Sequence, residues 1–234
     1  MSNALNCARH AAAAIAAAAV ICGVAVAAPS EIRWDTRVDR AAALSRETGK
    51  PILIEFWATW CETCAAMDKK VYADPAVANA MTAVLPVRVD IDRDPATARR
   101  YNVAATPTLV LVDAAGDELF RFTGSLEREP LLGLLRELPA DIRRINTLAA
   151  AVAVNKADAA ALDDLAGELR AAALYLASNR YYERALQTEK AKRDAALRAH
   201  LLTSIGRNYV ALKRPADAAE WFRRAEKVSL NAKE

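Results

Sequence analysis

The chain has 234 residues, which is enough for one ordinary domain and a smaller second one. Hydrophobic residues make up 54% and charged residues 26% of the sequence, and this balance excludes a disordered or fibrous protein. The formal net charge of +3 is too small to indicate binding of nucleic acid, and basic and aromatic residues do not interleave as they do in base-stacking surfaces.

The N-terminal segment, residues 1–27, has the pattern of a secretory signal peptide. Arg9 and His10 precede an uncharged run over residues 11–28, and Ala25-Val26-Ala27 offers small residues for cleavage. We therefore expect an exported protein, located in a bacterial periplasm. A retained membrane anchor is the alternative, although an alanine-rich run of this length is marginal for a membrane span.

The cysteines favour redox chemistry over a disulfide-stabilised scaffold. Cys7 and Cys22 lie in the segment that is expected to be removed, so the mature chain keeps only Cys61 and Cys64. One close cysteine pair in an exported chain has no other cysteine to bond with, and such a pair is typical of a redox-active site.

Residues 28–139 are predicted to form an α/β domain. Helical periodicity over residues 37–48 ends at Gly49, and the apolar run 51–57 indicates a strand that is buried on both faces. Further along the chain, the pattern predicts helices over 61–70, 75–83, 95–101 and 126–138, and strands over 85–91, 108–112 and 118–122. The order β-α-β-α-β-β-α predicts a mixed sheet with helices on its faces.

Residues 140–234 carry only alanine-rich helical periodicity and are predicted to form a helical second domain. The spacing of a tetratricopeptide helix pair is met by Leu202, Ile205, Gly206, Tyr209, Ala218, Phe222 and Ala225, with a turn at Arg214-Pro215. The stretch 169–192 is a weaker match. Residues 182–186 resemble the start of a second helix, but Glu189 and Lys192 stand where apolar residues are expected. A plain helical hairpin is the alternative.

The sequence Cys61-Glu62-Thr63-Cys64 directly follows the buried strand. Cysteines at i and i+3 meet on one face of a helix, and a helix N-terminus stabilises a thiolate at the first of them. Such a pair exchanges disulfides without a cofactor or a metal ion. Half of a zinc site is a competing interpretation, but His200 is the only histidine of the mature chain. An inert structural disulfide is another, although so small a loop would stabilise little.

At these residues the chain resembles the thioredoxin superfamily, over residues 33–138. The sequence EFWATWCETC at 55–64 matches its strand-to-helix active site, and VAATPTL at 103–109 matches the loop that places a cis-proline opposite the cysteines. Asp74-Pro75 and Asp90-Ile91-Asp92 are most similar to the C-terminal domain of thiol:disulfide interchange proteins. The resemblance implies a thioredoxin-like fold, client proteins that bear thiols or disulfides, and an upstream electron donor.

The resemblance also implies a role for each site residue. Cys61 would be the nucleophile and Cys64 the resolving thiol. A cis Pro107 and the backbone beside Thr106 would pair with an extended substrate segment, where the alternative is an ordinary proline that starts a strand.

Two further side chains are assigned roles in the same way. Glu55 stands where thioredoxins carry a buried acid, one methylene longer than the usual Asp, and would accept the proton of Cys64. An edge-exposed glutamate without a catalytic part is the alternative. Trp60 would shield the cysteines and contact partners, or would only pack.

Three functions compete at this point. The first is an exported thiol-disulfide oxidoreductase with a helical tail that binds client proteins. Glu62 places a negative charge near Cys61, which raises the pKa of that thiol and favours a reductase or isomerase over an oxidase. The second is an adaptor in which the tail recruits a protein partner and the first domain is a scaffold. The third, a peroxidase-like enzyme, would require a lone peroxidatic cysteine. The intact cysteine pair and Pro107 favour the first.

Overall fold

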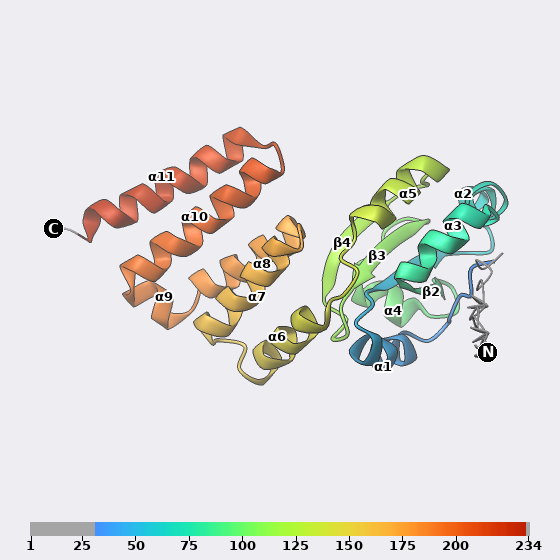
Figure 1. Ribbon diagram of the computed structural model, residues 1–234, viewed down its shortest axis with the longest axis horizontal. Helices are drawn as coiled ribbons and strands as arrows, with labels where there is room; N and C mark the ends of the chain where they lie inside the picture. The colour runs from blue at the N-terminus through green and yellow to red at the C-terminus, as the bar shows by residue number, and fades with distance from the viewer. Residues whose placement is uncertain (1–30, 233–234) are drawn as a thin grey trace, which may run out of the picture.

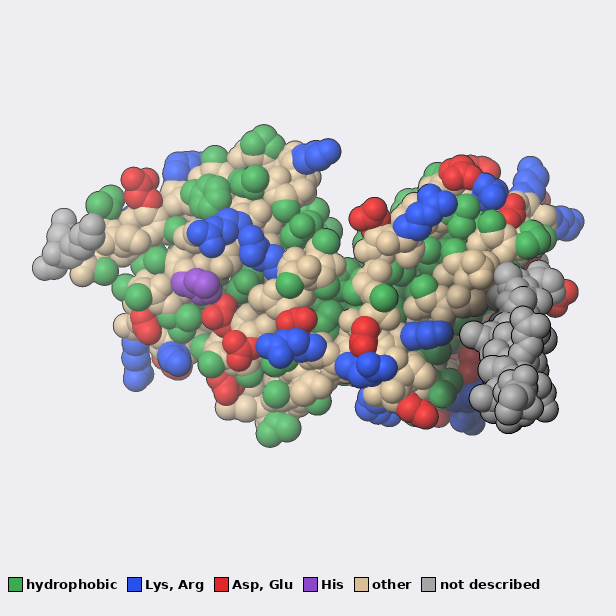
Figure 2. Space-filling model, viewed as in Figure 1, with side chains coloured by type: hydrophobic (Ala, Val, Ile, Leu, Met, Phe, Trp, Pro, Cys, Tyr) green, Lys and Arg blue, Asp and Glu red, His purple; other side chains and the backbone are tan. Residues whose placement is uncertain are grey.

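The computed structural model describes residues 31–232 (Figure 1). The predicted signal peptide, with Cys7 and Cys22, lies outside the described residues. Within 31–232, no helix is both long enough and apolar enough to cross a membrane. Lys and Arg side chains are interspersed with Asp and Glu on the face drawn in Figure 2, so this face carries no large area of a single charge sign.

The first part of the described chain is a four-stranded mixed sheet with flanking helices, as the sequence predicts. The strands are β1 (Ile52–Trp57), β2 (Leu85–Asp90), β3 (Thr108–Val112) and β4 (Glu118–Thr123). Their order is β2-β1-β3-β4, in which β2 runs parallel to β1 and the other neighbours are antiparallel. The helices here are α1 (Val38–Thr48), α2 (Glu62–Met67), η1 (Asp68–Tyr72), α3 (Pro75–Ala80), η2 (Met81–Ala83), α4 (Pro95–Arg100) and α5 (Arg128–Glu137).

The central strand β1 is buried on both faces. Its side chains point alternately to the two faces of the sheet, and this alternation decides on which face the site lies. Ile52, Ile54 and Phe56 belong to the hydrophobic cluster that also contains Ala41 of α1 and Ala98 of α4. Leu53 belongs to the cluster on the opposite face. Successive side chains of a strand point to opposite faces, so Glu55 shares the face of Leu53. The one acidic residue of β1 is therefore directed into the layer of α2 and its neighbours.

The predicted helix over 61–70 is wrong in one respect. The α-helical part ends at Met67 and continues as the five-residue π-helix η1. The wider turn accommodates inward-facing Val71 and Tyr72, which are both buried. It also leaves Asp68 where its carboxylate meets an arginine of β2. The predicted helix over 75–83 likewise divides into α3 and η2.

The second part of the described chain is helical, as expected. It comprises α6 (Arg143–Val154), α7 (Ala159–Ala171), α8 (Tyr175–Leu186), α9 (Glu189–Arg193), α10 (Ala195–Ala211) and α11 (Pro215–Asn231). Tyr181 of α8 donates a hydrogen bond to the Asp117 carboxylate at 2.8 Å, beside the start of β4. One hydrophobic cluster includes both Leu53 of the sheet and Leu165 of α7. The tail thus packs against the β4 side of the sheet domain, while the boundary at 139/140 stays a prediction.

The tail contains two helix pairs whose packing residues follow the same spacing. In the α10–α11 pair, the seven residues singled out by spacing include Gly206, whose added Cβ would lie 2.6 Å from the ring of Phe222. The α7–α8 pair repeats that spacing with Leu162, Leu165, Ala166, Leu169, Ser178, Tyr182 and Ala185, all of them buried. Residues 182–186 therefore lie at the end of α8, the second helix of this pair, and not at the start of a helix. The predicted stretch 169–192 leaves out most of α7, the first helix of the pair. The tetratricopeptide interpretation itself stays a prediction.

The contact between Gly206 and Phe222 predicts opposite effects of two glycine-to-alanine substitutions. Gly133→Ala in α5 is expected to stabilise the protein by about 0.5–1 kcal/mol, because nothing lies within 4 Å of the added methyl group and alanine favours a helix. Gly206→Ala is expected to destabilise it by about 1 kcal/mol, because the new Cβ displaces the Phe222 ring. Urea unfolding followed by circular dichroism compares the two variants. Equal stabilisation by both would show that the ring moves aside freely.

Candidate active site

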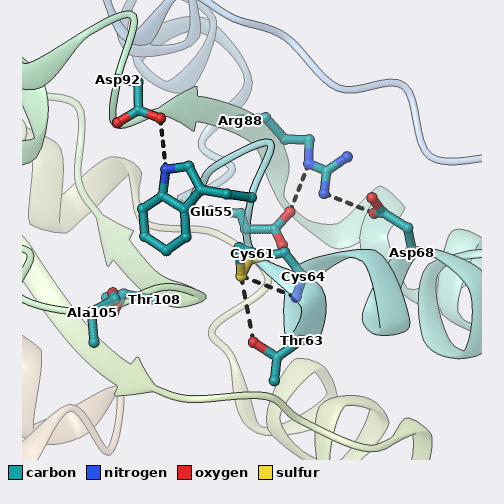
Figure 3. Close-up of a disulfide and its surroundings, with 10 residues drawn as sticks. Glu55, Cys61, Thr63, Cys64, Asp68, Arg88, Asp92, Ala105 and Thr108 are labelled. Carbon is teal, nitrogen blue, oxygen red and sulfur yellow. Dashed lines mark hydrogen bonds and ion pairs between the residues drawn. A yellow bond between two sulfur atoms is a disulfide. The ribbon is translucent and has the colours of Figure 1, made fainter.

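The cysteine pair lies at the start of α2. Cys61 and Cys64 form a disulfide, and Cys61 is the N-cap residue of the helix (Figure 3). The Cys61 sulfur accepts a hydrogen bond from the Cys64 backbone N–H at 3.1 Å and lies 3.4 Å from the Thr63 hydroxyl. Cys61 is 6% exposed and Cys64 only 1%, so Cys61 is the more accessible of the two. These donors and the helix N-terminus would stabilise a thiolate on Cys61.

The loop before β3 has the conformation that the resemblance to the thioredoxin superfamily implies. The Thr106–Pro107 peptide bond is cis. The Thr108 hydroxyl closes this turn by donating to the Ala105 carbonyl at 2.7 Å, and Figure 3 draws both residues together with the disulfide. Pro107 is buried, whereas Ala104 and Ala105 are exposed. The backbone just before the proline is therefore accessible to an extended chain.

Glu55 is fully buried, so the alternative of an edge-exposed glutamate is wrong. It lies directly opposite Arg88 in the parallel register of β1 and β2, and the Arg88 Nε donates to its carboxylate at 2.8 Å. Burial raises the pKa of Glu55 to about 7, although the positive charge of Arg88 acts in the lowering direction. The other Glu55 oxygen, Oε1, has no hydrogen-bond partner among the described protein atoms. A carboxyl group with this pKa exchanges a proton near neutral pH.

Arg88 is a site residue that the sequence analysis missed. Its guanidinium also donates to the Asp68 carboxylate at 2.7 Å. The guanidinium carbon lies 4.9 Å from the ring centres of both Trp34 and Trp57, so two indoles cover the ion pair. The sequence did show an arginine within the alternating strand pattern at 85–91. However, that pattern does not identify the carboxylates with which the arginine pairs.

Removing Arg88 is expected to destabilise the protein in a pH-dependent way. Arg88→Met leaves the buried Glu55 carboxylate without its cation, which costs about 3 kcal/mol of unfolding free energy at pH 8. The pKa of Glu55 then rises further, and at pH 5.5 the neutral carboxyl group makes the loss smaller. Urea unfolding at the two pH values measures the difference.

Arg93→Met is the matched control, because the Arg93 side chain is 84% exposed and pairs with Asp90 at the surface. We expect it to cost less than about 0.5 kcal/mol at either pH. A loss for Arg88→Met that is the same at pH 5.5 and pH 8 would contradict a role through the charge of Glu55.

Trp60 and Glu62 lie at the surface around the disulfide. Trp60 is 63% exposed, and its indole N–H donates to the Asp92 carboxylate at 2.8 Å (Figure 3). The ring is thus held in place without being part of the core, and it is available to a partner. Asp92 is a second residue whose contact was not predicted. Glu62 is exposed in the first turn of α2.

No three His, Cys, Asp or Glu side chains gather as a metal site within residues 31–232. His200, the histidine considered for a zinc site, lies on α10 and contacts Asp163 of α7 at 3.2 Å. The two cysteines are bonded to each other. The disulfide between the two cysteines is the feature that supports thiol-disulfide chemistry.

Comparisons with known proteins point in the same direction. A family model described as a thioredoxin-like domain matches residues 38–139. The thiol:disulfide interchange protein DsbD 2 of Pseudomonas aeruginosa is 33% identical over 96 residues, which are 38% of this chain and 16% of that protein. A thioredoxin of Mycolicibacterium smegmatis is 35% identical over 91 residues, which are 39% of this chain and 78% of that protein.

Among solved structures, a thioredoxin from Thermus thermophilus is 33% identical, with a TM-score of 0.41, and the match covers 46% of this chain and 86% of that one. The chain spans less than a fifth of the length of the interchange proteins that it matches, for example 16% of the Pseudomonas protein and 17% of that of Ralstonia nicotianae.

Proposed function

The chain belongs to the thioredoxin-like family, and on that premise we propose that it is an exported thiol-disulfide oxidoreductase that reduces or isomerises disulfides in client proteins. The observation that carries the proposal is the Cys61–Cys64 disulfide at a helix start, on the sheet face that also holds the buried Glu55. The clients are exported proteins that bear thiols or disulfides. The predicted signal peptide supports a periplasmic location, and no cofactor is needed.

The reaction proceeds by two displacements at sulfur. In the reduced enzyme, the Cys61 thiolate attacks one sulfur of a client disulfide, forms a mixed disulfide and releases the first client thiolate. Glu55 accepts the proton of the Cys64 thiol, and the Cys64 sulfur attacks Cys61 and releases the second client thiolate. The client gains two electrons, and the enzyme is left with its Cys61–Cys64 disulfide. An upstream dithiol donor must then reduce it again.

Client binding is assigned to the surface around the disulfide. The exposed backbone at Ala104 and Ala105, next to the cis Pro107, would pair with an extended client segment as an added strand. The exposed Trp60 ring would contact the same segment. This binding mode depends on the backbone, so it fits many client sequences.

The charge of Glu62 sets the expected direction of electron flow. A carboxylate in the first turn of α2 opposes the helix dipole and destabilises the Cys61 thiolate, which makes the dithiol a stronger reductant. Equilibration with glutathione buffers is expected to give a reduction potential of about −200 mV or lower. Glu62→Gln should move it to a more oxidising value. A wild-type potential near that of the strongest periplasmic oxidants, about −120 mV, would contradict the assignment as reductase or isomerase.

A second candidate function is an adaptor, in which the tail recruits a protein partner and the sheet domain is its scaffold. The observation that favours it is the residue spacing shared by the α7–α8 and α10–α11 pairs, which is typical of stacked tetratricopeptide-like units. Enzyme and adaptor roles are compatible if the tail brings clients to the redox site. Substitution of Cys61 separates them.

A further inference from the structure

The helical tail contains a cavity of about 480 Å³, which we call the tail cavity. Its lining residues lie on or directly beside α8, α9, α10 and α11. The apolar side chains that line it are Leu186, Leu202, Trp221 and Val228. A volume in this range is typical of sites that enclose a small ligand or a few side chains.

Cations dominate the charged residues that line the tail cavity. Lys192, Arg198, Arg224 and Lys227 line it, against a single acidic residue, Glu183. Lys192 pairs with Glu189 at 2.8 Å, whereas the other three cations have no ion pair with any residue in the described range 31–232. Within the described residues, the tail cavity thus carries positive charge that no ion pair compensates.

Some arginines elsewhere in the tail form ion pairs with nearby carboxylates. Arg144 pairs with Glu168 at 2.7 Å, and Arg214 pairs with Asp217 at 2.8 Å. In the tail cavity, by contrast, the Arg224 guanidinium lies over the Trp221 ring at 4.1 Å. Stacking on the indole orients Arg224 and leaves its N–H groups available to an acceptor.

We propose that the tail cavity binds an acidic protein segment that carries an apolar side chain. The apolar side chain would enter the cavity beside Trp221 and Leu202, and the flanking carboxylates would pair with Arg224 and Lys227. A second copy of this chain fits less well, because it would bring the same cations face to face. This proposal gives a chemistry to the partner of the tail, and it rests on the recruiting role of the tail in the proposed function.

The position of the tail cavity indicates what its occupant would do. Figure 1 shows α9 and α11 at one end of the molecule and α2, where the disulfide lies, at the other. A segment held in the tail cavity therefore lies away from the cysteines. Its binding would tether a partner and raise the local concentration of the rest of that partner near the redox site.

The test uses a fluorescein-labelled peptide of sequence EDEFEDE with the full chain, followed by fluorescence anisotropy. Peptides EDESEDE and KRKFKRK serve as probes without the apolar anchor and without the acidic flanks. We expect EDEFEDE to bind most tightly and to weaken with added salt, because the contacts are ionic. In a nuclear magnetic resonance titration, addition of EDEFEDE should shift the signal of the Trp221 indole N–H. That signal is identified by its loss from the spectrum of the Trp221→Phe variant.

Charge reversal locates the binding. Arg224→Glu with Lys227→Glu should weaken binding of EDEFEDE about tenfold or more, because like charges then face each other. Arg223→Glu is the matched control, since Arg223 is exposed on the same helix and does not line the tail cavity. No preference for EDEFEDE, an unmoved Trp221 signal, or an equal loss in the control variant would overturn the proposal.

Other occupants are separate outcomes that would also overturn it. Cosedimentation with phosphatidylglycerol vesicles that depends on Arg224 and Lys227, without peptide binding, would assign the tail cavity to a lipid surface. Self-association that is lost in the double variant would assign it to a second copy. If the wild-type protein reduces insulin but does not bind the peptide, only the inference about the tail fails. If it binds the peptide but does not reduce insulin, the proposed oxidoreductase function fails.

Discussion

Cys61→Ser is expected to abolish the reduction of insulin by dithiothreitol that the wild-type protein catalyses. A serine hydroxyl cannot form the mixed disulfide, so the first displacement has no nucleophile and the rate falls to that of dithiothreitol alone. The assay follows the turbidity of the released insulin chains. A helical tail with intact binding does not restore this activity, so the measurement separates the enzyme from the adaptor.

Cys64→Ser is the matched variant for the second displacement. It keeps the Cys61 nucleophile at the helix start, so it still attacks client disulfides, but it cannot resolve the mixed disulfide. For the Cys64→Ser variant, covalent adducts with exported proteins should accumulate and be visible on non-reducing gels. These adducts should be absent when Cys61→Ser is introduced as well. Wild-type turnover by the Cys61→Ser variant would contradict the nucleophile assignment, and full activity of Cys64→Ser would contradict the resolving role.

Glu55→Gln is expected to stabilise the protein at alkaline pH and to slow catalysis. Burial raises the pKa of Glu55 to about 7 in the folded state, from an ordinary value of 4.5. The folded protein therefore binds more protons than the unfolded chain between these pH values, and the wild type loses stability as the pH rises through this window. The loss amounts to about 3 kcal/mol above pH 7, and glutamine, which has no charge to bury, avoids it.

Two measurements check this pair of effects. In urea unfolding, the stability of Glu55→Gln relative to the wild type should grow by about 2–3 kcal/mol between pH 5 and pH 8.5. In single-turnover experiments, release of the client from the mixed disulfide should slow by about 10²-fold or more, because Cys64 loses its proton acceptor. Glu62→Gln, at an exposed position, is the control whose stability should not show this pH dependence. A flat stability difference or an unchanged release rate would remove Glu55 from the proton transfer.

Much of the fold was predictable because the signals are local. The apolar run at 51–57, the alternation at 85–91 and the paired strands at 108–112 and 118–122 each specify an element through neighbouring residues. The structure has all four strands at these positions. The end of α2 was less predictable, because the π-helical turn over Asp68–Tyr72 depends on what Val71 and Tyr72 pack against.

The helical tail also contains contacts that the local sequence pattern does not predict. Spacing alone identified the α10–α11 pair, in which Gly206 and Phe222 touch. The α7–α8 pair has the same spacing, but Ser178 and Tyr182 stand where the α10–α11 pair has Ala218 and Phe222. This difference hid the position of the pair in the sequence. The side chain of Ser178 donates to the Ala166 carbonyl at 2.7 Å inside the pair, a contact that no pattern of hydrophobic residues predicts.

The sequence by itself determined the cysteine pair and its position after a buried strand, because these depend on spacing along the chain, and the resemblance to the thioredoxin superfamily implied the loop with Pro107. Only the tertiary structure decided the environment of that pair. The register of β1 and β2 sets Arg88 opposite Glu55, and the packing of α2 and η1 brings Asp68 to the same guanidinium. Likewise, the cations of the tail cavity come from separate helices. Such contacts join residues far apart in the chain, so they follow from packing rather than from local pattern.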